Sequence, residues 1–201
     1  MLVGCNPLAP LAYYLRPPQI QKPEFEFPAD SRVLLLVETA RPEQANPVFE
    51  HALQEQCSTL LKEGGCKATL LPRSALAELR MANADFSSWS LQRIGRELGA
   101  DYVLYFRLEQ LQVREAPDHP VLSPVAVGRC RVVGVRQPAA DARVWPDSAE
   151  GHEVRCTRQT SQADEPDAVD SESAQLGHDT AYWLTMPFTT VDLERSPPVQ
   201  R

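Results

Sequence analysis

The sequence lacks long apolar runs, excess positive charge and phosphate-binding loops, and each absence excludes a class of protein. No apolar run approaches the roughly 20 residues that a membrane-spanning helix needs. Lysine and arginine number 20 against 27 aspartate and glutamate, a net charge of −7, whereas nucleic-acid-binding domains carry a concentrated basic face. The pair Gly64-Gly65 lacks the lysine of a phosphate loop. We therefore expect no nucleic-acid partner and no cofactor.

Residue combinations typical of catalysis or metal binding are also missing. No serine stands in a Gly-x-Ser-x-Gly turn, and no paired Cys-x-x-Cys or His-x-x-x-His element indicates zinc. We therefore expect a protein that is not an enzyme and holds no metal. One alternative stays open: Trp145, His152 and Cys156 could form an atypical small-ligand, metal or enzyme site, because the latter two share one side of a predicted strand.

The aromatic residues after Gly99 raise the question of RNA binding, in which a sheet stacks bases on its aromatic side chains. Alternation places Tyr102 and Phe106 on the core face of a strand, and no basic stripe is evident beside Tyr105. Core packing is therefore the favoured interpretation of these residues.

The five cysteines carry information about export. Cys5 closes the phrase Leu2-Val3-Gly4-Cys5, which resembles the lipobox at which bacterial lipoproteins are acylated on cysteine. The charged and apolar part of a signal peptide is not in the sequence, so a chance match is the alternative. The proline-rich stretch that follows favours a lipoprotein, and we predict a lipid on Cys5 that anchors the chain to a membrane. The other four allow two disulfides or buried free thiols: Cys57, Cys66, Cys130 and Cys156.

Prolines number 18 and crowd toward both ends, which is typical of extended, poorly packed segments. We expect residues 1–30 to hold the lipobox-like start and a proline-rich tether, residues 31–190 a single domain, and residues 191–201 a disordered tail. The tether contains apolar residues such as Leu11 and Tyr13, so part of it could lie on the domain or on the membrane surface.

Hydrophobic patterns predict the elements of the domain. The first half should contain a covered strand at 32–37, a helix from Pro47 capped by Asn46 and ended by Gly64-Gly65, a strand at 66–71 and a helix at 74–81. The second half should contain a strand at 125–135 with a flat face of small residues, antiparallel partners at 144–145 and 154–160, an acidic loop and a helix at 171–186. This order indicates an α+β fold, a mixed β-sheet with helices packed on it: early β-α-β-α-α, then a β-meander and a C-terminal helix.

The central unit spans residues 87–113. Ser87 or Ser88 can cap a helix that Gly99 ends in a left-handed turn. From Tyr102 apolar and polar residues alternate, which predicts a strand with one buried face. The phase slips near Gln110, where we expect a β-bulge or a sheet exit.

The phrase Leu98-Gly99-Ala100-Asp101-Tyr102-Val103-Leu104 resembles a signature of bacterial envelope lipoproteins. These include the curli-secretion-channel lipoproteins, the lipoprotein activators of penicillin-binding proteins and the N-terminal domain of the Tol translocation protein. The resemblance implies an α+β domain over about 32–188, in the cell envelope and facing the periplasm. Taken with Cys5, it leads us to expect a non-enzymatic, lipid-anchored protein-interaction or assembly module with an envelope protein as its partner.

Overall fold

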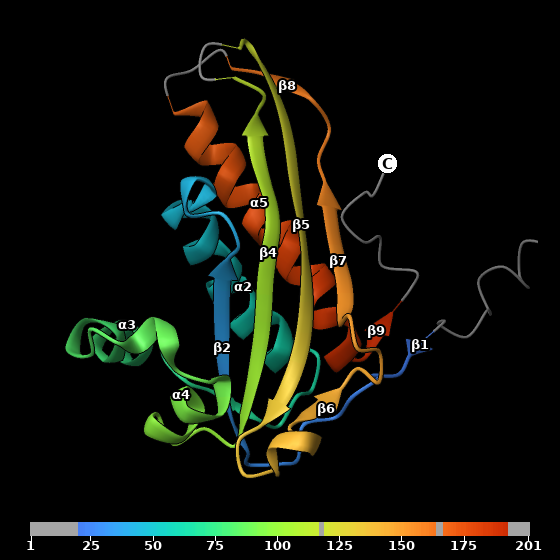
Figure 1. Ribbon diagram of the computed structural model, residues 1–201. Helices are drawn as coiled ribbons and strands as arrows, with labels where there is room; N and C mark the ends of the chain where they lie inside the picture. The colour runs from blue at the N-terminus through green and yellow to red at the C-terminus, as the bar shows by residue number, and fades with distance from the viewer. Residues whose placement is uncertain (1–19, 117–118, 164–166, 193–201) are drawn as a thin grey trace, which may run out of the picture.

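The computed structural model describes residues 20–116, 119–163 and 167–192 (Figure 1). Its strands are β1 (Ile20–Gln21), β2 (Arg32–Thr39), β3 (Thr69–Leu70), β4 (Tyr102–Arg114), β5 (Val121–Gly134), β6 (Arg143–Trp145), β7 (His152–Thr157), β8 (Ser161–Gln162) and β9 (Val191–Asp192). Its helices are α2 (Pro47–Glu63), α3 (Arg73–Ala82), α4 (Leu91–Glu97) and α5 (Ala168–Thr185), with short 3-10 turns η1 (Pro42–Gln44), η2 (Phe86–Ser88), η3 (Ala139–Asp141) and η4 (Met186–Phe188).

A mixed sheet of seven strands forms the centre of the domain. Its order is β3-β2-β4-β5, and β6, β7 and β8 all pair with the far side of β5. β2 runs parallel to β3 and β4, which fits the helical crossovers between them, while every pairing of β5 is antiparallel. The predicted α+β class and the order of its elements are confirmed.

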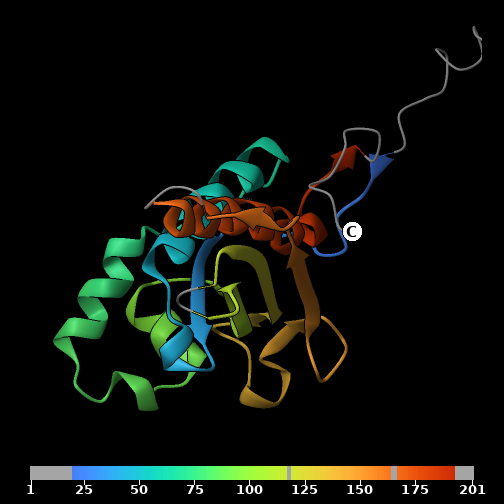
Figure 2. The ribbon, with the colours of Figure 1, turned by 90° about the horizontal axis from the view of Figure 1, so that it is seen from above.

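One face of the sheet is fully covered by α2 and α5, which lie side by side behind it in Figure 1 and above it in Figure 2. The predicted start of α2 is confirmed: Pro47 is its first residue, and the Asn46 side chain caps it by accepting a hydrogen bond from the backbone N–H of Phe49. Phe106 is completely buried in this main core. Its principal members from the helices and the sheet are Phe49, Leu53, Cys57, Leu176, Ala181, Leu184, Leu104, Phe106 and Leu108.

Among the described residues, the opposite face is covered only where β2 and β4 begin. There α3 and α4 contribute Leu76 and Ile94 to a second, smaller core, and both helices lie at the same end of the sheet (Figure 1). The prediction of one buried face for β4 is therefore wrong at its start, where Val103 and Tyr105 are buried. Alternation identifies the two faces of a strand, but it cannot show that short helices cover part of the second one.

The central unit otherwise forms as its residues predict, with one shift. Ser90, rather than Ser87 or Ser88, caps α4 by accepting a hydrogen bond from the N–H of Arg93 at 3.2 Å. Gly99 has φ +65°, the left-handed conformation expected just past the helix. The expected β-bulge is confirmed, because Leu108 pairs with Gly128 and Gln110 with Val127, leaving Glu109 as the extra residue.

Four further boundaries differ from the prediction by three or four residues. The strand expected at 154–160 is β7, which ends at Thr157. The strand expected at 66–71 is only the two residues of β3, because the chain turns away at Pro72 toward α3. The strand expected at 125–135 begins four residues earlier, at Val121, where β8 provides a partner. The last helix begins at Ala168 rather than at residue 171. The small residues of β5 do receive a close neighbour, since a Cβ at Gly128 would lie 2.6 Å from the Phe106 ring.

The described part of the proline-rich stretch lies on the domain. β1 pairs with β9, and Phe25 and Phe27 pack edge-on against Tyr102 at the end of the sheet. Phe188 of η4 contacts both Phe25 and Phe27 and so belongs to the same aromatic group. Within the described ranges, no helix combines the length and the apolar character needed to cross a lipid bilayer.

Candidate interaction surface

The uncovered part of the second sheet face is the candidate site, and we call it the open face. It faces the viewer above α4 in Figure 1. Polar and charged side chains from four adjacent strands and one loop meet on it: Glu38, Tyr105, Arg107, Glu109, Arg129, Arg131, Glu150, Glu153 and Arg155. A depression of about 430 Å³ lies between β4, β5 and the loop before β7.

Arginines occupy neighbouring positions on the two central strands. Arg107 lies directly opposite Arg129, and Arg131 lies opposite Tyr105. Arg129 is compensated, because its guanidinium lies 2.9 Å from Glu150 and 3.5 Å from Glu109. Neither Arg107 nor Arg131 forms an ion pair with a residue in the described ranges. Two guanidinium groups therefore stand on this face without an ion pair in the described part of the chain, although the register of β2 with β4 sets Glu38 opposite Arg107.

Tyr105 marks the boundary between the second core and the open face. Its hydroxyl donates a hydrogen bond to the Glu38 carboxylate, and the Arg131 guanidinium lies 4.9 Å from its ring centroid. Burial, aided by the bond to Glu38, raises the pKa of Tyr105 to about 12. The phenol therefore stays protonated near neutral pH and acts as a fixed donor rather than as a base.

The sequence interpretation that no basic stripe accompanies Tyr105 is wrong. Arg129 and Arg131 alternate with Cys130 on β5, so both point away from the main core. That alternation was available in the sequence. What it could not supply was the register that sets Arg131 beside Tyr105 and Arg129 beside Arg107.

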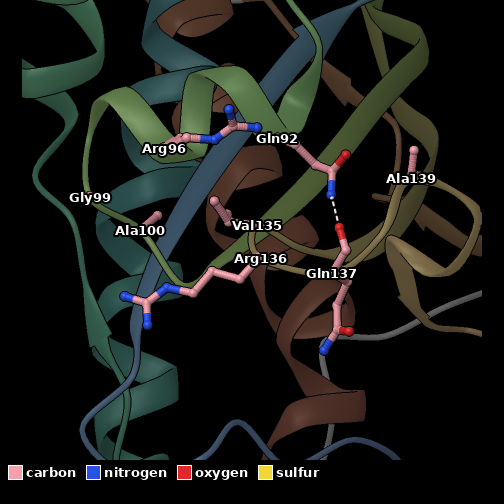
Figure 3. Close-up of a pocket in the computed structure, with 8 residues that line it drawn as sticks. All are labelled: Gln92, Arg96, Gly99, Ala100, Val135, Arg136, Gln137 and Ala139. Atoms are coloured by element: carbon pink, nitrogen blue, oxygen red, sulfur yellow. Dashed lines mark hydrogen bonds between the residues drawn. The ribbon is translucent and has the colours of Figure 1, made fainter.

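A second depression, of about 630 Å³, lies between α4 and the turn after β5 (Figure 3). The Gln92 side chain donates hydrogen bonds to the carbonyl oxygens of Gly134 and Gln137, at 3.1 and 2.8 Å, and so ties α4 to that turn. Arg96 and Arg136 extend in different directions and do not converge on one point (Figure 3). Arg136 is instead paired with Asp101 at 3.3 Å. This depression is the rim of the second core, with no gathered set of functional groups.

The residues of the alternative site are only partly brought together. The rings of Trp145 and His152 are in contact, with centroids 5.1 Å apart and planes tilted by 36°, and Trp145 also contacts Phe188. Cys156 lies four residues farther along β7, about 13 Å away at the rise of a strand. Within the described ranges, no group of three or more His, Cys, Asp or Glu side chains is arranged to hold a metal ion.

The four cysteines of the domain are free thiols. Three of them are buried in the main core, and we call them the buried thiols: Cys57, Cys130 and Cys156. Burial raises the pKa of all three, to about 12 for Cys130 and about 11 for Cys156. They are therefore protonated near neutral pH and are packing residues rather than nucleophiles. Cys5, the predicted lipidation site, lies outside the described residues.

No protein-family model and no curated protein matches the sequence. Among solved structures, the PelC dodecamer from Paraburkholderia phytofirmans is similar at 16% identity and a TM-score of 0.44, covering 85% of this chain and 96% of PelC. Lipoprotein GNA1162 from Neisseria meningitidis is similar at 14% identity and a TM-score of 0.43, covering 73% of this chain and 90% of that one.

The C-terminal domain of LpoB from Salmonella enterica is similar at 18% identity and a TM-score of 0.37, covering 65% of this chain and 84% of that one. Similarity at this level concerns the fold alone.

Proposed function

We propose that this chain is a non-enzymatic protein of the bacterial cell envelope, held at the membrane by a lipid on Cys5, and that it binds another envelope protein through the open face. The anchor is supported by the lipobox-like phrase that ends at Cys5 and by the proline-rich stretch that follows it. The interaction role rests on one observation, the pairing of Arg107 with Arg129 on an uncovered sheet face.

Like charges directly opposite one another in a sheet destabilise it by roughly 0.2–1 kcal/mol. Glu38 lies opposite Arg107 and Glu153 opposite Arg129, and Arg129 forms two ion pairs. Exposed pairs contribute about 0–1 kcal/mol each, so they offset a cost of this size. Folding thus gains little from this arrangement of charges. Residues that break a local rule of stability are typical of functional sites, and guanidinium groups form two parallel hydrogen bonds to carboxylates. The partner surface should therefore present carboxylates to Arg107 and Arg131.

The anchor is tested by fractionating cells that express the chain behind a lipoprotein signal peptide. The parent protein should sediment with membranes, and Cys5→Ala should be released into the soluble fraction. Equal distribution of the two would show that Cys5 carries no anchor.

The surface is tested by affinity capture from envelope extract. A double variant, Arg107→Glu with Arg131→Glu, should lose a protein that the parent retains. Lys62→Glu is the matched control, because Lys62 is an exposed cation on α2, in the layer behind the sheet. Retention of the same protein by both variants would refute the open face as the binding surface.

A further inference from the structure

The free edge of β2 is a second surface, where part of the strand has no strand partner among the described residues. β3 pairs with β2 only at Arg32 and Val33, although β2 continues to Thr39. The last backbone bond on that side runs from the N–H of Leu71 to the carbonyl of Val33, at 2.9 Å. Beyond it, about 16 Å of strand has no strand partner within the described ranges.

The direction of the backbone groups along this edge follows from the register with β4. The carbonyl of Arg32 accepts from Asp101, and the N–H of Ala40 donates to Leu108, so even-numbered residues bond toward β4. Odd-numbered residues bond toward the opposite side, as Val33 does. The N–H and C=O groups of Leu35 and Val37 therefore point out of the free edge. Such unpaired edge groups are a template for another strand.

A groove of about 260 Å³ runs beside this edge, between α2 and the segment that leads from β3 into α3. Its lining is Leu34, Leu35, His51, Gln54, Glu55, Ser58 and Leu70–Arg73. The Oε1 atom of Gln54 is buried without a hydrogen-bond donor within the described ranges. A buried acceptor left unpaired is unusual in a folded protein, and here it belongs to a groove wall.

Two carboxylates of α2 and one guanidinium of α3 lie around this edge. Glu50 lies within 3.5 Å of the Thr39 hydroxyl, and Glu55 lies 3.7 Å from His51. Within the groove lining, Glu55 is the only carboxylate, and Arg73 is the only basic residue apart from His51. Because side chains of an added strand alternate between two sides, one side would meet the carboxylates near α2 and the other the leucines near α3.

We propose that an extended basic segment of a partner protein adds to the free edge of β2 as an additional strand, with lysine or arginine alternating with apolar residues. Backbone hydrogen bonds to Leu35 and Val37 supply its affinity, and the carboxylates of Glu50 and Glu55 select its charge. This site requires neither the lipid on Cys5 nor the open face, so it can fail or hold independently of the proposed function.

The test uses the full chain, labelled with nitrogen-15, and a blocked hexapeptide of alternating lysine and valine. Binding should slow amide hydrogen exchange at Leu35 and Val37 by roughly tenfold or more. A glutamate–valine hexapeptide, and a lysine–valine hexapeptide N-methylated at every second amide, should not bind. Glu55→Lys should weaken binding about three- to tenfold at low salt, whereas Glu63→Lys, an exposed position on the same helix, should leave it unchanged.

Several results would overturn the proposal. Equal binding of the N-methylated peptide would mean that backbone pairing is not involved. Protection at Arg107 or Arg129 instead of Leu35 would move the site to the open face, and no binding at about 1 mM peptide (a free energy of about −4 kcal/mol) would remove the site altogether. Concentration-dependent protection of Leu35 and Val37 without peptide would show that a second copy of this chain occupies the edge.

Discussion

The contact between α2 and α5 offers the sharpest test of the packing, at Gly177. This glycine lies on α5 close to the backbone of α2, and it is buried. A Cβ added there would stand 2.6 Å from the backbone oxygen of Phe49 and 3.0 Å from both the Cβ of Ala52 and the backbone nitrogen of Leu53. The backbone of α2 cannot rotate away as a flexible side chain can, so Gly177→Ala must push the helices apart.

The sign of the effect distinguishes packing from helix propensity. Alanine in place of a helical glycine should by itself stabilise by about 1 kcal/mol. Relieving the closest contact requires a movement of about 0.8 Å, from 2.6 Å to the 3.4 Å of ordinary contact. Overpacking costs about 1–3 kcal/mol, and we place this case near 3 because the obstacles are mainly backbone atoms. The net expectation is a loss of about 2 kcal/mol, or about 4–8 °C in Tm for a domain of this size.

The assay is urea unfolding followed by circular dichroism, supported by a thermal melt. The control is Gln175→Ala, an exposed position on the same helix, which should change the free energy of unfolding by less than about 0.5 kcal/mol. A Gly177→Ala protein as stable as the parent, or more stable, would refute the close helix contact.

Three further expectations concern the core, the turn and the thiols. Phe106→Ala should cost about 3–5 kcal/mol in the free energy of unfolding, measured in urea, while Arg107→Ala barely changes it; equal shifts would refute the strand phase. Gly99→Val should lower Tm more than Gly99→Asn, because asparagine tolerates a positive φ and a β-branched residue does not; the reverse order would contradict the left-handed turn. In the folded protein the pKa values of the buried thiols are raised above the unfolded value of about 8.5. The free energy of unfolding therefore keeps its full value below about pH 8.5 and falls as the pH rises toward the folded pKa values. Each buried thiol should lower the free energy of unfolding by about 1.4 kcal/mol at pH 9.5. In urea titrations the free energy of unfolding of Cys57→Ala should therefore fall by about that much less than that of the parent between pH 7 and pH 9.5. An identical fall in both proteins would contradict the burial of that thiol.

The sequence by itself determined the local elements and their order. The Asn46 cap, the Gly99 turn and the phase slip before Gln110 depend on interactions within a few residues, so a linear pattern contains them. The class of the fold followed, because helices alternating with early strands imply parallel neighbours. Burial of Phe106 was also predictable, since alternation is a local property of a strand.

Only the tertiary structure decided which surfaces stay uncovered. Tyr105 is buried because α3 and α4 fold back over the start of the sheet, and Arg107 is exposed because those helices are too short to reach farther. The arginine pairing depends on the register between β4 and β5, which joins residues 22 positions apart in the chain, Arg107 and Arg129. The free edge of β2 depends on β3 ending after two residues, although the apolar pattern around it continues. Such features arise from contacts between distant segments, and the periodicity of a single segment does not specify them.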